Sequence, residues 1–198
     1  MWYYNSKIKT PRPMTIGDVL YPSSIIRDSS LLASLGIKPY SETTPDSRYY
    51  WNGAFTLDES GDEVVGTYAG SAIDVATLKA SMLSNINSQV ASKQGAIDWY
   101  WARASKGGTA VPANIATYAT TIYSEQATKE GEVNALSTLD AIKLYEAKPH
   151  TEVRKVKNED GTYGPTTTSA TRHINMLQHW TANPTDEVDE AFVSLTAD

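Results

Sequence analysis

The residues best suited to acid–base or metal chemistry are three histidines, His150, His173 and His179. His173 and His179 are six residues apart, a spacing that does not pair them on one turn of a helix as metal ligands usually are. The chain has no cysteine, so neither a thiolate nucleophile nor a cysteine-based zinc site is available. We therefore expect no metal centre, no cofactor and no catalytic residue.

Carboxylates crowd one turn, at Asp58, Glu59, Asp62 and Glu63. Carboxylates are calcium ligands, but the ligand order of an EF-hand is absent, and a solvated turn explains the cluster better. The sequence also lacks a Gly-x-Ser-x-Gly motif, a phosphate-binding glycine loop and a dinucleotide-binding fingerprint. These absences favour a protein that is not an enzyme.

Aromatic residues occur in three runs, at 2–4, 49–51 and 99–101. Adjacent aromatic residues on a strand or helix cannot all face one core, so some of them should face outward. Tyrosine and tryptophan are enriched at protein interfaces because they bury a large area and keep a polar group. The candidate interface residues are these aromatics and one helical stripe: Trp2, Tyr4, Tyr49, Trp51, Leu78, Met82, Ile86, Val90, Trp99 and Trp101.

The stretch 71–146 positions most of these residues and predicts two long helices. The first helix should begin at Ser71 or Asp74, both of which suit a helix cap. The apolar stripe in steps of three and four predicts one buried face, with Asn85 and Ser88 toward solvent. The pattern runs to about Arg103, and Gly95 is a point where the helix can kink or break.

The second helix should follow a break at 106–109, with Pro112 in its first turn. Its apolar positions fall in two blocks, and the stripe positions between them hold Glu125 and Lys129. We therefore expect the middle of this helix to be more solvated than its ends. The short connection favours an antiparallel helical hairpin.

Short strands are expected before the helices. The sequence predicts a small hairpin around Asn5, extended pieces around the Gly17-Asp18 turn, and a short helix from Ser29 to Leu35 capped by Asp28. A longer hairpin should join 48–57 to 63–68, with Tyr49, Trp51 and Phe55 on one face and Tyr50 on the other.

The C-terminal part should begin with a hairpin of 152–157 and 162–168 around the turn 158–161. The spacing of His173, Met176, Leu177 and Trp180 favours a helix over 169–182. The last stretch, 185–198, is expected to be either a short helix or an extended tail. That helix would place Val188, Ala191, Phe192 and Leu195 on its apolar face.

The predicted fold class is α+β. It has a small β-rich N-terminal docking module (1–70), a central long antiparallel helical hairpin (71–148) and a small mixed C-terminal segment (149–198), which holds a β-hairpin and short helices. The net charge is −6 and no run of basic residues exists, which argues against nucleic-acid binding. No stretch is long and apolar enough for a membrane span, and the first residues do not fit a signal peptide.

Four motifs carry a resemblance to a known group of proteins: Trp2-Tyr3-Tyr4-Asn5, the stretch 15–22, the stretch 35–39 and the stretch 45–51. Together they resemble the start of small structural proteins of tailed bacteriophages. Such proteins have a short β-rich head followed by helices rich in Ala, Ser and Glu. The likeness covers roughly residues 1–145.

The resemblance implies a bacteriophage virion protein of the viral tail, baseplate or tail fibre. It would be assembled in the host cytoplasm and present as a homo-oligomer or as multiple copies in a symmetric assembly. Its partners would be other virion structural proteins, with no nucleic acid and no membrane, and it carries over no catalytic residue. Two alternatives stay open, which are a tail-fibre assembly chaperone and a glycan-binding module at a fibre tip.

Overall fold

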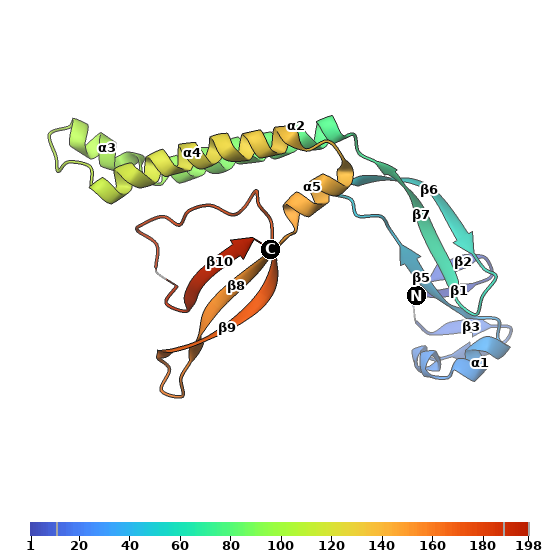
Figure 1. Ribbon diagram of the computed structural model, residues 1–198. Helices are drawn as coiled ribbons and strands as arrows, with labels where there is room; N and C mark the ends of the chain where they lie inside the picture. The colour runs from blue at the N-terminus through green and yellow to red at the C-terminus, as the bar shows by residue number, and fades with distance from the viewer. Residues whose placement is uncertain (11, 188, 198) are drawn as a thin grey trace. The chain divides into compact units, whose positions relative to one another are not determined.

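The computed structural model describes residues 1–10, 12–187 and 189–197, and within them the chain is mixed α+β, with five α-helices (Figure 1). The predicted α+β class is confirmed. The chain divides into two compact units, Met1–Ile73 and Asp74–Asp198. The finer prediction of three segments stays a prediction.

The first unit consists mainly of short strands. Its elements are β1 (Trp2–Tyr4), β2 (Lys7–Lys9), β3 (Met14–Ile16), β4 (Val19–Tyr21), a 3-10 turn (Ser23–Arg27), α1 (Ser29–Ser34), β5 (Lys38–Thr43), β6 (Tyr50–Asp58) and β7 (Val64–Ala72). The predicted first hairpin is confirmed, because Asn5 and Ser6 take positive φ in the turn between β1 and β2. The Asp28 carboxylate caps α1 by accepting a hydrogen bond from the Leu31 N–H at 2.9 Å, as predicted.

The five-stranded sheet has the order β2-β1-β5-β7-β6. All of its pairs are antiparallel except β5 with β7. Trp2 and Tyr3 point to opposite faces of β1, yet both are buried. Trp2 packs with Leu32 and Ile37, and Tyr3 lies in a second cluster with Tyr40 and Val64. Two adjacent aromatics are therefore buried because this strand has apolar neighbours on both faces.

A β-bulge in β6 changes the predicted arrangement of the second aromatic run. The register against β7 shifts between Asn52 and Phe55. Cross-strand partners share a face, so Tyr50 and Phe55 both lie on the face of β7 that carries Tyr68. The expectation that Trp51 and Phe55 share a face is wrong, because the extra residue in the bulge reverses the alternation.

The helices of the second unit are α2 (Val75–Gly95), α3 (Asp98–Ser105), α4 (Ala113–Ala135) and α5 (Leu139–Glu146). Asp74 caps α2 by accepting hydrogen bonds from two backbone N–H groups, so the second of the two predicted starts is correct. The predicted helix to Arg103 breaks after Gly95, and a new helix begins at Asp98. The second predicted helix also breaks, since α4 ends at Ala135 and α5 begins at Leu139. The Thr138 hydroxyl caps α5 by accepting a hydrogen bond from the Ala141 N–H.

Helices α2 and α4 lie side by side (Figure 1). The Gln94 amide donates to the Ala119 carbonyl at 3.0 Å, and the Lys79 ammonium donates to the Asn134 carbonyl at 2.6 Å. The start of α2 is therefore next to the end of α4. Lys79 satisfies carbonyl groups that the C-terminus of α4 leaves without helical partners.

The predicted stripe on α2 is buried at Met82, Ile86 and Val90, whereas Leu78 is half-buried. Asn85 and Ser88 are exposed, as expected. On α4 the buried apolar residues are Ile115, Tyr118, Ala119, Ile122 and Val133.

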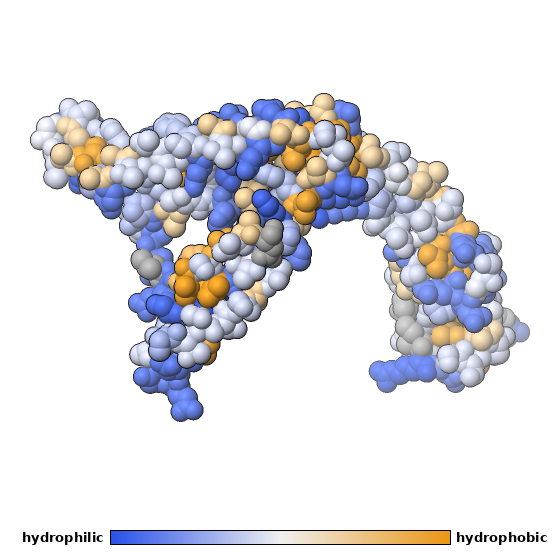
Figure 2. Space-filling view, viewed as in Figure 1, coloured by the Kyte–Doolittle hydropathy of each residue, from blue (hydrophilic) through white to orange (hydrophobic). Residues whose placement is uncertain are grey.

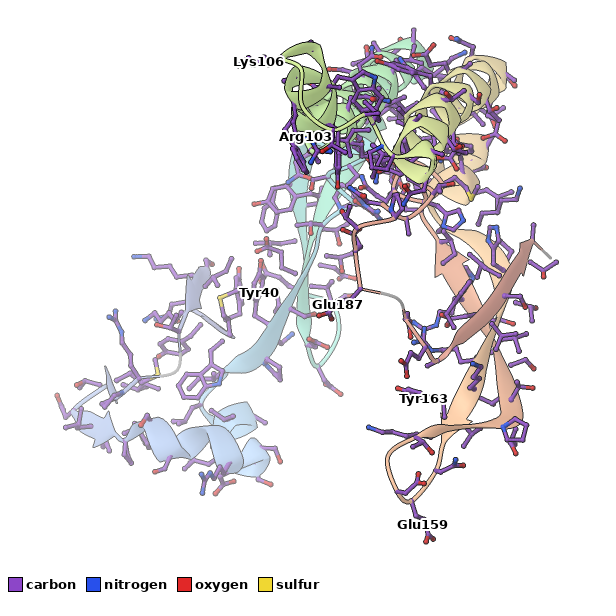
Figure 3. All side chains as sticks on the ribbon, turned by 90° about the vertical axis from the view of Figure 1, so that its left-hand side faces the viewer. Tyr40, Arg103, Lys106, Glu159, Tyr163 and Glu187 are labelled. Atoms are coloured by element: carbon purple, nitrogen blue, oxygen red, sulfur yellow. The ribbon has the colours of Figure 1, made fainter. Side chains whose placement is uncertain are left out.

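The C-terminal sheet has the order β10-β8-β9 and consists of β8 (Lys148–Lys157), β9 (Tyr163–Ile174) and β10 (Phe192–Ala197). Figure 3 shows Glu159 at the tip of the predicted β8–β9 hairpin and Tyr163 at the start of β9. The expected helix over 169–182 is wrong, because β9 continues to Ile174 in register with β8. Of the two expectations for the last stretch, the extended one is correct over Phe192–Ala197. Val188 lies outside the described residues.

Candidate functional site

The candidate interface residues fall into three groups by exposure. Those that are buried within their own units are Trp2, Tyr49, Met82, Ile86 and Val90. Two others, Tyr4 and Leu78, are half-buried. The exposed ones are Trp51, Trp99 and Trp101. That any of these residues contacts a partner stays a prediction. Trp51, Trp99 and Trp101 are the strongest candidates because they are exposed.

Strand β6 presents the most exposed of these residues. It lies at the edge of the five-stranded sheet, and Trp51 is 64% exposed. Phe55 and Leu57 are also exposed, on the opposite face of the strand from Trp51. The sheet face that carries Phe55 is lined by Gly66 of β7, where an added methyl group would collide with Phe55 and Tyr40. The absence of a side chain at Gly66 thus leaves the space that the Phe55 ring and the Tyr40 hydroxyl occupy.

Helix α3 carries a second aromatic group. The rings of Trp99 and Tyr100 have centroids 3.8 Å apart, and the guanidinium of Arg103 lies 4.9 Å from the Trp99 ring centroid. Trp101 is exposed on the same helix, and Figure 3 marks Arg103 there. The arrangement orders Trp99 at the surface through stacking and a cation–π contact. The Trp99 and Tyr100 rings are tilted by 31° against each other, and about half of Trp99 stays exposed.

A third exposed apolar area lies on β10, where Figure 2 shows an orange patch. Phe192 and Val193 are both exposed there, as is Val156 of the neighbouring β8.

A groove of about 400 Å³ runs along α4 beside the turn that follows β9. Its lining is hydroxyl-rich, with two carboxylates and two basic groups: Thr117, Thr120, Thr121, Ser124, Glu125, Thr128, Lys129, Glu132, Met176 and His179. Four of the hydroxyl groups donate to carbonyls four residues earlier in α4. The hydrogens of these four hydroxyls are therefore committed within the helix, and each can offer a ligand only its oxygen as an acceptor.

Lys129 is only 5% exposed, so the expectation that the middle of α4 is solvated is wrong at this residue. The segment 175–181 covers it. The Lys129 ammonium donates to the Met176 carbonyl and lies 4.9 Å from the centroid of the Trp180 ring. Glu125 holds the same segment, because its carboxylate accepts hydrogen bonds from the Thr181 N–H and hydroxyl. Both charged residues that interrupt the apolar stripe therefore form hydrogen bonds with the segment 175–181.

Burial shapes the electrostatics of this groove. It lowers the pKa of Lys129, because the charged ammonium loses hydration. It also lowers the pKa of His179, and the positive charges of Lys129 and His150 act in the same direction. The His150 and His179 rings have centroids 6.4 Å apart. His150, buried on β8, therefore lies close to His179, one of the two basic groups that line the groove.

Sequence reasoning missed this groove. The visible indication was the interruption of the α4 stripe by Glu125 and Lys129. A helix face open to solvent would show the same interruption. A groove covered by chain differs from it only in that the segment 175–181 packs over α4, which the local sequence does not show.

Among the described residues, no group of three or more histidines, aspartates and glutamates is arranged to hold a metal ion. In the same part of the chain, no helix is long and apolar enough to cross a membrane. Comparison with known proteins adds no relative, because no protein family, curated protein or solved structure matches this chain.

Proposed function

We propose that this chain is a non-enzymatic structural component of a tailed-phage virion, in the tail, baseplate or fibre region, and that it acts through protein–protein interfaces. The observation that carries the interface part is the exposure of aromatic residues in each unit, with Trp51 and Phe55 on β6 of the first and Trp99 and Trp101 on α3 of the second. The phage part rests on the resemblance of the N-terminal motifs.

The total accessible surface supports a role in assembly. It is 12557 Å², compared with about 9,200 Å² for a compact monomer of 21.6 kDa. Two separate compact units of these lengths would expose about 11,000 Å², which is still less. Surface in excess of both values is expected of a chain that buries more area when it joins a larger assembly.

The proposed division of labour follows the expected segments. The β-rich module 1–70 would dock on one neighbour, and an antiparallel helical hairpin within 71–148 would act as the rigid element between subunits. The segment 149–198 would present the C-terminal sheet. Localisation in the virion and multiple copies in a symmetric assembly belong to the same proposal.

A second candidate function is glycan binding at a fibre tip, and the α3 platform favours it. Stacked Trp99 and Tyr100 offer an aromatic face of the kind that sugar rings bind. A glycan array probed with the chain and with Trp99→Ala would separate this role from a protein-only interface.

The proposed function is tested by quantitative mass spectrometry of purified virions and of the lysate that produced them. A structural subunit should stay with the particles through density-gradient purification, in a fixed ratio to the other tail proteins. Abundance in the lysate with loss from the particles would instead indicate an assembly chaperone. Absence from both fractions of any phage infection would remove the virion proposal altogether.

A further inference from the structure

Asn52 and Gly53 are neighbours whose side-chain and backbone groups can react with each other. Of the asparagines in the chain, Asn52 alone is followed by glycine. The backbone nitrogen of a following residue can attack an asparagine amide, and a glycine there has no side chain to hinder the approach. The fold decides whether the two groups can meet.

The fold places this pair where strand β6 is weakly constrained. The ladder pairs Asn52 with Gly70 and resumes with Phe55 opposite Tyr68, so two residues of β6 oppose one residue of β7 between them. A bulge of this kind disrupts the ladder locally, and it begins at Gly53, directly after the asparagine. Among the described strands β6 pairs with β7 alone, so no second strand holds its other edge.

The Asn52 side chain can turn toward the backbone. It is exposed, and no group among the described residues forms a hydrogen bond with its amide. Its cross-strand partner Gly70 has no side chain that would hold it. Gly53 is exposed as well, so water and base can reach both reacting groups.

We propose that Asn52 is a site of spontaneous deamidation, through a cyclic imide formed with the backbone nitrogen of Gly53. Closing the ring requires rotation about the Asn52 Cα–C bond, away from the extended conformation of a strand. In a strand paired on both sides this rotation breaks ladder hydrogen bonds on both edges. In β6 one edge is unpaired and the bulge disrupts the other, so a local opening is sufficient. The inference goes beyond the proposed function, because it needs no partner.

The reaction consumes only water and needs only a base. The deprotonated Gly53 nitrogen bonds to the Asn52 Cγ atom, and the Cγ–Nδ2 bond breaks so that Nδ2 leaves as ammonia. Water then adds to one of the two imide carbonyl carbons and breaks the bond from that carbon to the Gly53 nitrogen. Opening at Cγ gives aspartate in a normal backbone. Opening at the main-chain carbon gives isoaspartate, whose backbone runs through Cβ and Cγ.

Both products change the edge strand. Each adds a negative charge to β6, in which Asp58 is otherwise the single charged residue. Isoaspartate also inserts a methylene group into the main chain beside the bulge. The residues on one side of position 52 would then shift relative to their partners on β7.

Asp160 and Gly161 can form the same imide, but the structure opposes it there. The Asp160 carboxylate accepts hydrogen bonds from the Thr162 hydroxyl at 2.7 Å and from the Thr162 N–H at 2.9 Å. These hydrogen bonds lower the pKa of Asp160, so the group stays ionised at neutral pH. An ionised carboxylate resists attack by a nucleophile, whereas the Asn52 amide is neutral and unrestrained.

The first test incubates the isolated chain in mildly alkaline buffer and follows each asparagine by peptide mass spectrometry. Asn52 should be converted first, with release of ammonia, and an isoaspartate peptide should appear beside the aspartate peptide. Because only the deprotonated nitrogen attacks, the rate should rise about tenfold per pH unit. Asn52→Gln should form no product on this timescale, since glutamine would have to close a larger ring.

Asn87 is the matched control within the same chain. It is exposed and followed by the small residue Ser88, but it lies inside α2, where backbone N–H groups are bonded along the helix. Asn87 should therefore stay unconverted in the folded chain. In urea both asparagines should react, and Asn52 should still react faster because glycine follows it.

Three results would overturn the inference. One is conversion of Asn52 no faster than that of Asn87 in the folded chain. Another is a rate at Asn52 more than about tenfold lower in the folded chain than in urea, which would show that β6 protects the pair against local opening. The third is equal release of ammonia from the wild type and Asn52→Gln, which would place the reaction at another residue.

Discussion

Ile86 lies in the middle of the α2 stripe and is fully buried. Replacing it with alanine removes buried methyl groups and leaves a cavity, so Ile86→Ala should lower the free energy of unfolding by roughly 2–5 kcal/mol. Ser88→Ala on the exposed side of the same helix should change it by no more than about 0.5 kcal/mol. Urea denaturation measures both. Equal, negligible effects would mean that the stripe does not form the core of the second unit.

His179 should make the second unit sensitive to acid. Its pKa is lowered in the folded chain, so the unfolded chain binds the proton first as the pH falls below about 6.5. Stability should therefore fall as the pH drops from 6.5 toward the lower folded pKa. Thermal unfolding between pH 7.5 and 5 should show a shallower loss for His179→Gln. Identical pH profiles for the two chains would show that this imidazole is not a source of the acid sensitivity.

At the scale of an element, the segment 175–181 is held on α4 by Lys129 and Glu125. Lys129→Met keeps the length of the side chain but leaves the Met176 carbonyl without this donor. A hydrogen bond to a charged group contributes about 1.5–3 kcal/mol, and the opening free energy of the segment should fall by about that amount. Hydrogen exchange at the Thr181 amide reports it, with exposed Lys106→Met as the control. Unchanged exchange at Thr181 would show that other contacts hold the segment.

The elements that could be read from the sequence are those fixed by local chemistry. Asp28 and Asp74 cap helices, and the turns at Asn5 and around Gly161 close hairpins, as their residue types predict. The extension of β9 to Ile174 was missed, because pairing with β8 overrides the helical spacing of its last residues. The reversal at the β6 bulge was missed because no residue type alone marks where an extra residue enters a ladder.

At the scale of the whole molecule, the chain should fold without a metal ion. We expect a chelator to leave the melting temperature unchanged, because only a ligand that binds the native state would raise it. Differential scanning calorimetry with and without EDTA measures this. A drop of several degrees would reveal a metal site that neither the sequence nor the described residues indicate.

The most direct test of the account is the accessibility of single tryptophans before and after assembly. Hydroxyl-radical footprinting of the isolated chain should oxidise Trp51, Trp99 and Trp101, while buried Trp2 stays protected as an internal control. In purified particles that contain the chain, at least one of the three exposed tryptophans should become protected to the level of Trp2. If all three are oxidised equally in the isolated chain and in the particle, none of these exposed tryptophans lies in an assembly interface.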